Sequence, residues 1–193
     1  MLRELAPLLA EDGLDLDRPT YDLETLQQTL NRAVQRRNLA LFTPVGRRRV
    51  LAVDIVRRAV KALIDAEPYR ALEILNQAVP ESPDDSVAEV SSCIGLATGL
   101  MDEVLTGRNP HAPAGLWRRL RRSPIYGPGD VSALDIVAAA RKGQSFDSLE
   151  PLMIAYGGHE MLYGSSNALG MVVEAWSRAT GTPAADLIRA HIR

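Results

Sequence analysis

Apolar side chains recur along almost the whole chain at spacings of three and four residues. Leu23, Leu26, Leu30 and Val34 form one such stripe, and similar stripes follow as far as the last segment of the sequence. This spacing is typical of helices that bury one face, whereas a half-buried strand alternates at every second residue. Strand and helix signals do not alternate along the chain, which argues against a parallel-sheet enzyme fold. The sequence therefore predicts an all-α bundle of about eight or nine helices.

Residues that typically begin or end helices divide this pattern into segments. Asp22 is placed to cap one helix, since a side-chain oxygen there accepts hydrogen bonds from free backbone N–H groups, and Asp130 is placed to begin another. Pro68 and Pro183 suit the first turn of two others, because the missing N–H of proline has no partner there in any case. Gly107 is placed to end a long apolar helix.

One stretch, NLALFTPVGRRRVLAVD at residues 38–54, is compatible with two structures. Its β-friendly residues surround a Pro-Val-Gly turn, which indicates a small β-hairpin near residues 39–53. The competing interpretation begins a helix at Arg47, because valines recur at helical spacing from Val50 onward. We favour the helix and keep the hairpin as the alternative.

Length and composition place the chain among ordinary folded proteins. Its 193 residues are 46% hydrophobic and 24% charged, which is too apolar for a disordered chain and is consistent with a single globular domain over residues 1–193. The lone Cys93 allows no intrachain disulfide and no cysteine-based zinc site. The sequence has no apolar run of the kind that a signal peptide or a membrane span requires. We expect a cytoplasmic protein that does not bind a membrane.

Charge is distributed unevenly along the chain. Residues 32–61 contain nine basic residues and one acidic residue, Asp54, although the net charge of the protein is −2. Such polarity attracts an anionic partner, or allows two copies to dock head to tail. A helix followed by a basic hairpin has the order of a winged-helix DNA-binding module. In that alternative the residues that contact phosphates are Arg32, Arg36, Arg37, Arg47, Arg48 and Arg49.

The stretch YGGHEMLYGSSNALG, residues 156–170, resembles three catalytic motifs without completing any of them. A phosphate-binding loop needs a lysine that is absent here, and Tyr163 stands where a zinc-protease helix has its second histidine. A serine nucleophile elbow needs a preceding strand, and helical sequence precedes this one. We therefore assign no catalytic residue, and the protein is not expected to be an enzyme.

Two interpretations of this stretch remain. Its glycines, serines and alanine predict a small-residue helix face that another helix approaches closely, after a helix junction at Gly157 and Gly158. Alternatively, the small residues leave space for a small-molecule pocket. The residues at the mouth of that pocket are His159, Glu160, Tyr163, Ser166 and Asn167.

No metal or cofactor is assigned from the sequence, since His111, His159 and His191 do not lie at helical spacing from one another. The leading hypothesis is a non-enzymatic interaction or regulatory module that self-associates through a glycine- and alanine-rich helix face, as a homo-oligomer, or binds a protein partner. The alternatives are a winged-helix-like nucleic-acid-binding regulator that uses the basic region from Arg32 to Arg58, and a small-molecule-binding protein or enzyme with its pocket at residues 159–167.

Overall fold

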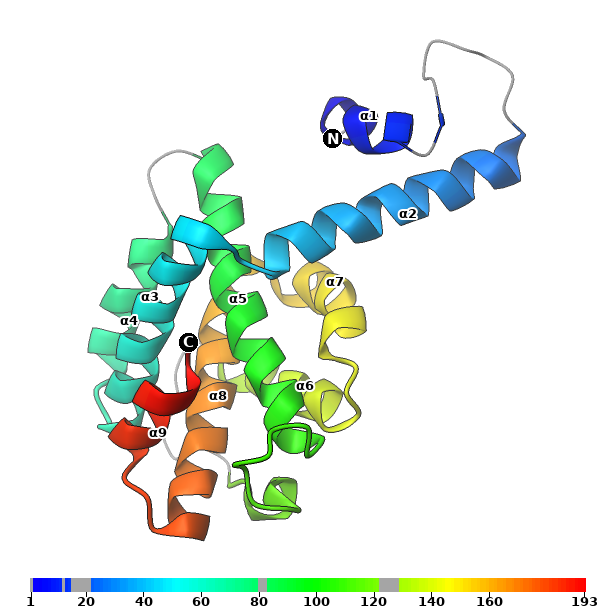
Figure 1. The fold of residues 1–193 in the computed structure, drawn as a ribbon. Helices are drawn as coiled ribbons and strands as arrows, with labels where there is room; N and C mark the ends of the chain where they lie inside the picture. Colours follow the sequence, from blue (N-terminus) through cyan, green and yellow to red (C-terminus); the bar gives the residue numbers. More distant parts are fainter. Residues whose placement is uncertain (1, 12, 15–21, 80–82, 122–128) are drawn as a thin grey trace. The chain divides into compact units, whose positions relative to one another are not determined.

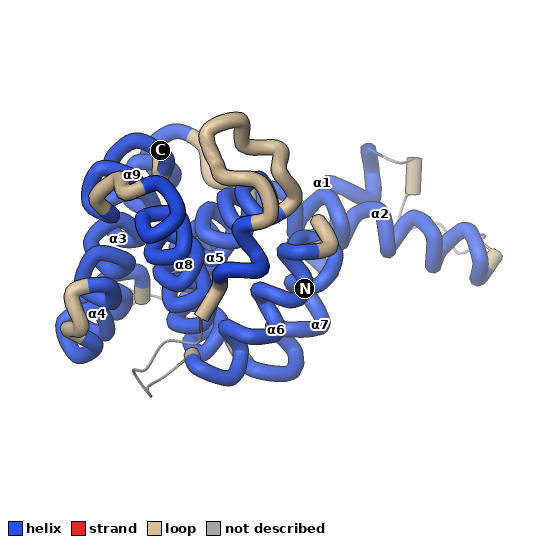
Figure 2. Tube along the Cα trace, turned by 90° about the horizontal axis from the view of Figure 1, so that it is seen from below, coloured by secondary structure: helices blue, strands red, loops and turns tan. Residues whose placement is uncertain are grey.

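The computed structural model describes residues 2–11, 13–14, 22–79, 83–121 and 129–193, and most of these residues are helical. Within these residues there are nine α-helices, two short 3₁₀ helices and no strand, so the all-α prediction is confirmed (Figures 1 and 2). The helices are α1 (Leu2–Glu11), α2 (Leu23–Phe42), α3 (Gly46–Ile64), α4 (Pro68–Leu75), η1 (Asn76–Ala78), α5 (Pro83–Leu105), η2 (Leu116–Arg119), α6 (Asp130–Arg141), α7 (Ser145–Tyr156), α8 (Gly158–Thr180) and α9 (Ala184–His191).

The chain divides into two compact units, an N-terminal unit of residues 1–43 and a C-terminal unit of residues 44–193. In the N-terminal unit α1 packs against α2 around a small core of Leu9, Leu14 and Ala33. Asp22 begins α2 as expected, because its carboxylate accepts a hydrogen bond of 2.8 Å from the backbone N–H of Thr25. The expectation of a single domain over the whole chain stays a prediction.

The ambiguous stretch at residues 38–54 forms the end of one helix and the start of the next. The backbone leaves the helical conformation at Thr43, before Pro44, and α3 begins at Gly46. The helix from Arg47 is therefore confirmed, and the β-hairpin near residues 39–53 is wrong. The physical reason is burial: α3 packs Ala52, Val56 and Val60 against other helices of the C-terminal unit, which outweighs the β-propensity of its valines.

The C-terminal unit is built around α8. Nearly every residue of α8 from Met161 to Val173 is buried, because α3, α5, α6, α7 and α9 all pack against this helix. Figure 1 shows α3 and α4 on one side of α5 and α8, and α6 and α7 on the other side. The segments on the two sides are distant in sequence, and the central pair of helices holds them in one core.

The helix boundaries in this unit follow the residues that the sequence pattern indicated. Pro68 is the first residue of α4, and Pro183 immediately precedes α9. The backbone at Gly107, just after α5, has a φ of 77°, which is a left-handed conformation that favours glycine. Local sequence therefore determines where these helices begin and end.

Candidate functional site

The stretch at residues 156–170 forms the junction between α7 and α8 and the first half of α8. Gly157 makes the sharp reversal with a φ of 79°, and α8 begins at Gly158. His159 in the first turn is exposed. The junction lies where the sequence predicted it, because a left-handed φ of this kind strains any residue with a Cβ.

Glu160 extends from the first turn of α8 to the start of α6. Its Oε2 accepts a hydrogen bond of 3.0 Å from the backbone N–H of Gly129, and its Oε1 accepts one of 3.1 Å from the Ser132 hydroxyl. The free N–H groups at a helix start carry partial positive charge. Glu160 therefore acts as an N-terminal cap for α6 that is supplied by another helix.

The small residues of α8 allow α6 to approach closely. A Cβ on Gly164 would stand 2.0 Å from the Oγ of Ser132, so only glycine fits at this position. Asn167, one turn further along, donates a hydrogen bond of 2.9 Å from Nδ2 to Oδ1 of Asp130. The small-residue face predicted for this part of α8 is thus a packing surface for the first turns of α6.

The remaining candidate residues of this stretch face different neighbours. Tyr163 donates a hydrogen bond of 2.7 Å to Oδ1 of Asn76, and burial raises the pKa of its phenol. Ser166 is fully buried, and within the described part of the chain its hydroxyl has no hydrogen-bond partner. Four of the five candidates are thus held against or within the protein itself, and ligand binding by them stays a prediction.

The six arginines of the nucleic-acid alternative are divided between the two units. Arg32, Arg36 and Arg37 lie on α2, where Arg36 approaches Glu11 to 3.8 Å. Arg47, Arg48 and Arg49 form the exposed first turn of α3. No strand follows α2 in the described residues, so the wing that a winged-helix module requires is not formed.

The basic residues further along α3 have structural partners. The Arg57 guanidinium donates hydrogen bonds of 2.7 and 2.9 Å to the carbonyls of Ile192 and Arg189, which are free at the end of α9. Arg58 binds the Asp54 carboxylate, with a shortest distance of 2.6 Å. Arg57 thus connects α3 to α9 and Arg58 pairs within α3, which leaves the first turn of α3 with positive charge that is exposed to solvent and unpaired among the described residues.

Two exposed helix faces in the C-terminal unit combine charge with large apolar side chains. The first, the α3 basic face, is the exposed N-terminal end of α3: it contains the three arginines of the first turn with Val45, Val50 and Leu51, of which Val50 is 71% exposed. The α7 acidic face contains Asp147 and Glu150 beside Phe146 and Ile154, of which Ile154 is 80% exposed. In the described residues, no ion pair engages the arginines of the α3 basic face. The two faces are therefore complementary in charge.

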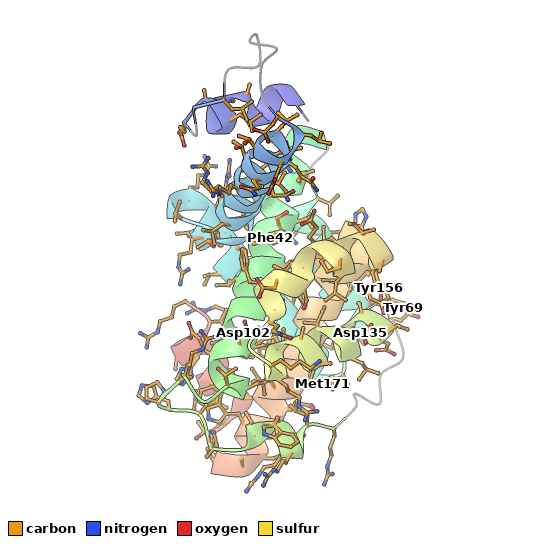
Figure 3. The ribbon with its side chains drawn as sticks, turned by 90° about the vertical axis from the view of Figure 1, so that its right-hand side faces the viewer. Phe42, Tyr69, Asp102, Asp135, Tyr156 and Met171 are labelled. Atoms are coloured by element: carbon orange, nitrogen blue, oxygen red, sulfur yellow. The ribbon has the colours of Figure 1, made fainter. Side chains whose placement is uncertain are left out.

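A buried carboxylate connects α5 to the start of α7. The Asp102 side chain, labelled in Figure 3, accepts a hydrogen bond of 2.5 Å from the hydroxyl of Ser145. Arg108 lies 3.9 Å away. Burial raises the pKa of Asp102, an effect that the hydrogen bond and the nearby arginine only partly oppose.

A pocket of about 410 Å³ lies between the end of α8, α9 and the loop after α5. The His191 ring stands 4.5 Å from the Trp176 ring and 5.6 Å from the His111 ring, measured between centroids. The sequence did not indicate that these two histidines are neighbours, because they lie far apart in the chain and on different structural elements. They come together because α9 and the loop after α5 meet beside the end of α8.

The thiol of Cys93 is surrounded by other residues of the protein core. Cys93 is buried in α5, and burial raises the pKa of its thiol to about 12, so it is an inert packing residue. Among the residues with defined positions, no three His, Cys, Asp or Glu side chains are grouped as a metal site requires. None of the described helices combines the length and apolar character needed to cross a membrane.

Comparison of the chain with protein-family models, curated proteins and solved structures gives no match.

Proposed function

We propose that the protein is a non-enzymatic interaction module that self-associates head to tail, with the α3 basic face of one copy bound to the α7 acidic face of the next. One observation carries the proposal: a single unit presents two exposed faces of opposite charge, and each face includes large apolar side chains. Charge complementarity favours this pairing over the pairing of two identical faces.

The positions of the two faces determine the type of assembly. The central helices α5 and α8 contact both α3 and α7 and lie between them (Figure 1). The two faces therefore belong to helices that α5 and α8 hold apart. A contact between unlike faces is heterologous, and it produces a ring or an open chain of copies.

Energetic considerations favour a weak, reversible contact. Complete burial of a fully exposed Val, Leu, Ile or Phe side chain contributes roughly 1.5–3 kcal/mol. Val50 and Ile154 are largely exposed, whereas Leu51 and Phe146 are only 38% and 39% exposed and gain correspondingly less. Association costs roughly 4–15 kcal/mol of lost translational and rotational freedom, so these four side chains offset only part of this cost. The charges add attraction that salt screens. We infer concentration-dependent association suited to a regulatory role in the cytoplasm.

Sedimentation velocity over a concentration series tests the proposal. At low salt we expect the average mass to rise with protein concentration and to exceed that of a dimer, because a heterologous contact does not close at two copies. The same series at high salt is expected to shift toward the monomer. A strict monomer at every concentration and salt level would overturn the proposal.

Charge exchange between the two faces provides a sharper test. The variant Arg47→Glu/Arg48→Glu and the variant Asp147→Lys/Glu150→Lys are each expected to remain monomeric, because each presents two faces of the same sign. A mixture of the two variants is expected to associate again, since each face then meets its opposite. Arg119→Glu/Arg121→Glu is the matched control, because it reverses two exposed charges outside both faces and is expected to associate like the wild type.

The same variants distinguish the nucleic-acid alternative. In that case the wild type remains monomeric, retards duplex DNA or RNA in a salt-dependent manner, and loses this binding in Arg47→Glu/Arg48→Glu. The variant Asp147→Lys/Glu150→Lys would then bind nucleic acid at least as well as the wild type. That set of results would replace self-association as the function of the basic residues.

A further inference from the structure

We infer that the pocket lined by His111, Trp176 and His191 binds a small anion that carries a carboxylate or a phosphate group. The site is separate from both association faces and does not depend on the proposed function. Its walls come from the end of α8, from α9 and from the loop after α5.

The pocket has the size and lining of a ligand site. Its volume of about 410 Å³ lies within the range of roughly 300–1,000 Å³ that is typical of small-molecule pockets. Trp176 and Leu187 provide buried apolar surface, and both imidazoles stand beside it. A ligand can therefore rest an apolar body on the tryptophan side and present its charged group to the histidines.

Charges around the pocket favour a negative ligand. His111, His191 and Arg193 supply positive or protonatable groups, whereas Asp186 is the one acidic side chain in the described lining. The Asp186 carboxylate is already paired with Arg189 in the next turn of α9. Arg57, which packs on α9 from α3, is engaged with backbone carbonyls. Arg193 donates a hydrogen bond from Nε to the carbonyl of Ala190, so its terminal nitrogens and the two imidazoles are the groups available to an anion.

The protonation state of the His191 imidazole depends on whether such an anion is bound. Burial lowers the pKa of His191, and the neighbouring His111 and Arg193 lower it further through like-charge repulsion. An anion placed between these groups cancels the repulsion and hydrogen-bonds to the protonated ring. Binding therefore raises the pKa of His191, and by reciprocity the affinity for the anion increases as the pH falls through the titration of His191.

The histidine resonances in NMR spectra provide a direct test. We expect the apparent pKa of His191 to rise on saturation with inorganic phosphate or with benzoate, compared with chloride at equal ionic strength. A response to phosphate alone identifies a phosphate site, and a response to benzoate alone identifies a site for aromatic carboxylates. Failure of both anions to change the His191 titration would overturn the inference.

Variants separate binding in the pocket from a general effect of salt. His111→Gln is the informative change because His111 is exposed, whereas His191 packs on Trp176. Loss of one charge-assisted hydrogen bond is expected to weaken anion binding roughly tenfold. His159→Gln, which removes an exposed histidine outside the pocket, serves as the control, and an equal loss of binding in this control would contradict the inference. The variant Arg47→Glu/Arg48→Glu is expected to bind the anion normally, which distinguishes this site from self-association.

Discussion

Gly164 of α8 and Ser132 of α6 are so close that a Cβ on Gly164 would stand 2.0 Å from the Ser132 Oγ and 3.1 Å from the backbone nitrogen of Ala133. The second distance involves backbone, which does not move aside as a side chain does. This contact sets how closely α6 approaches the central helix. The absence of a side chain at Gly164 is therefore a structural requirement of the C-terminal unit.

We predict that Gly164→Ala lowers the free energy of unfolding by about 1–3 kcal/mol or more, the usual cost of overpacking a core. Gly170→Ala is the matched control on the same helix, because the nearest atom to its added Cβ is the Cβ of Leu63 at 3.9 Å. That control is expected to raise stability by about 0.5–1 kcal/mol through helix propensity. Urea denaturation measures both values, and similar effects at the two positions would refute the close-contact explanation.

The cap that Glu160 supplies to α6 is testable in the same way. Glu160→Ala is expected to lower the free energy of unfolding by about 1–2 kcal/mol, because it removes the hydrogen-bond acceptors and the charge at the helix start. Glu160→Gln retains one acceptor, so a smaller loss is expected. His159→Ala changes the exposed neighbour and should lie within about 0.5 kcal/mol of the wild type. A loss from His159→Ala equal to that from Glu160→Ala would argue against a specific cap.

Two adjacent buried serines differ in their hydrogen bonding. The Ser165 hydroxyl donates to the carbonyl of Leu162 at 3.1 Å, whereas the described residues provide no partner for the hydroxyl of Ser166. Both changes to alanine gain the same helix propensity. We expect Ser166→Ala to be more stable than Ser165→Ala by about 1 kcal/mol, because an unpaired buried hydroxyl is costly. Thermal unfolding compares the two, and the reverse order would show that Ser166 has a partner in solution.

Asp102 makes the free energy of unfolding depend on pH, and its contribution becomes more favourable as the pH falls. Burial raises the pKa of Asp102 in the folded state above its value in the unfolded chain, so the folded state binds this proton more readily. The ionised form therefore opposes folding at neutral pH. This penalty is relieved as the pH falls through the folded-state pKa toward the unfolded value near 3.9. A carboxylate that gains hydrogen bonds or a cationic partner on folding has the opposite effect in general.

The variant Asp102→Asn isolates this contribution, since the other titrating groups cancel in the comparison. We expect the stability of the wild type relative to Asp102→Asn to increase as the pH is lowered from 7 toward 4. Denaturant midpoints measured at several pH values give this difference. Parallel curves for the two proteins would mean that the pKa of Asp102 is the same in the folded and unfolded states.

The helix boundaries followed from the sequence because their causes are local. Asp22 caps α2 and Gly157 reverses the chain through groups only a few residues away. The helices that pack against α8 were not predictable. Gly164 indicates that another helix approaches closely, but it does not specify that this helix is α6. The hairpin alternative at residues 39–53 was wrong for the same reason. The β-branched residues there suit a strand or a buried helix, and only the surface that buries α3 decides between the two.

The sequence by itself determined that this chain is all-α, where most of its helices begin and end, and that its basic residues are concentrated in one region. These properties depend on spacing, capping and composition, which act over a few residues. Only the tertiary structure decided that α5 and α8 separate the α3 basic face from the α7 acidic face, and that His111 and His191 share a pocket with Trp176. The physical reason is that packing of helices distant in sequence depends on surface complementarity over the whole core, which no local pattern encodes.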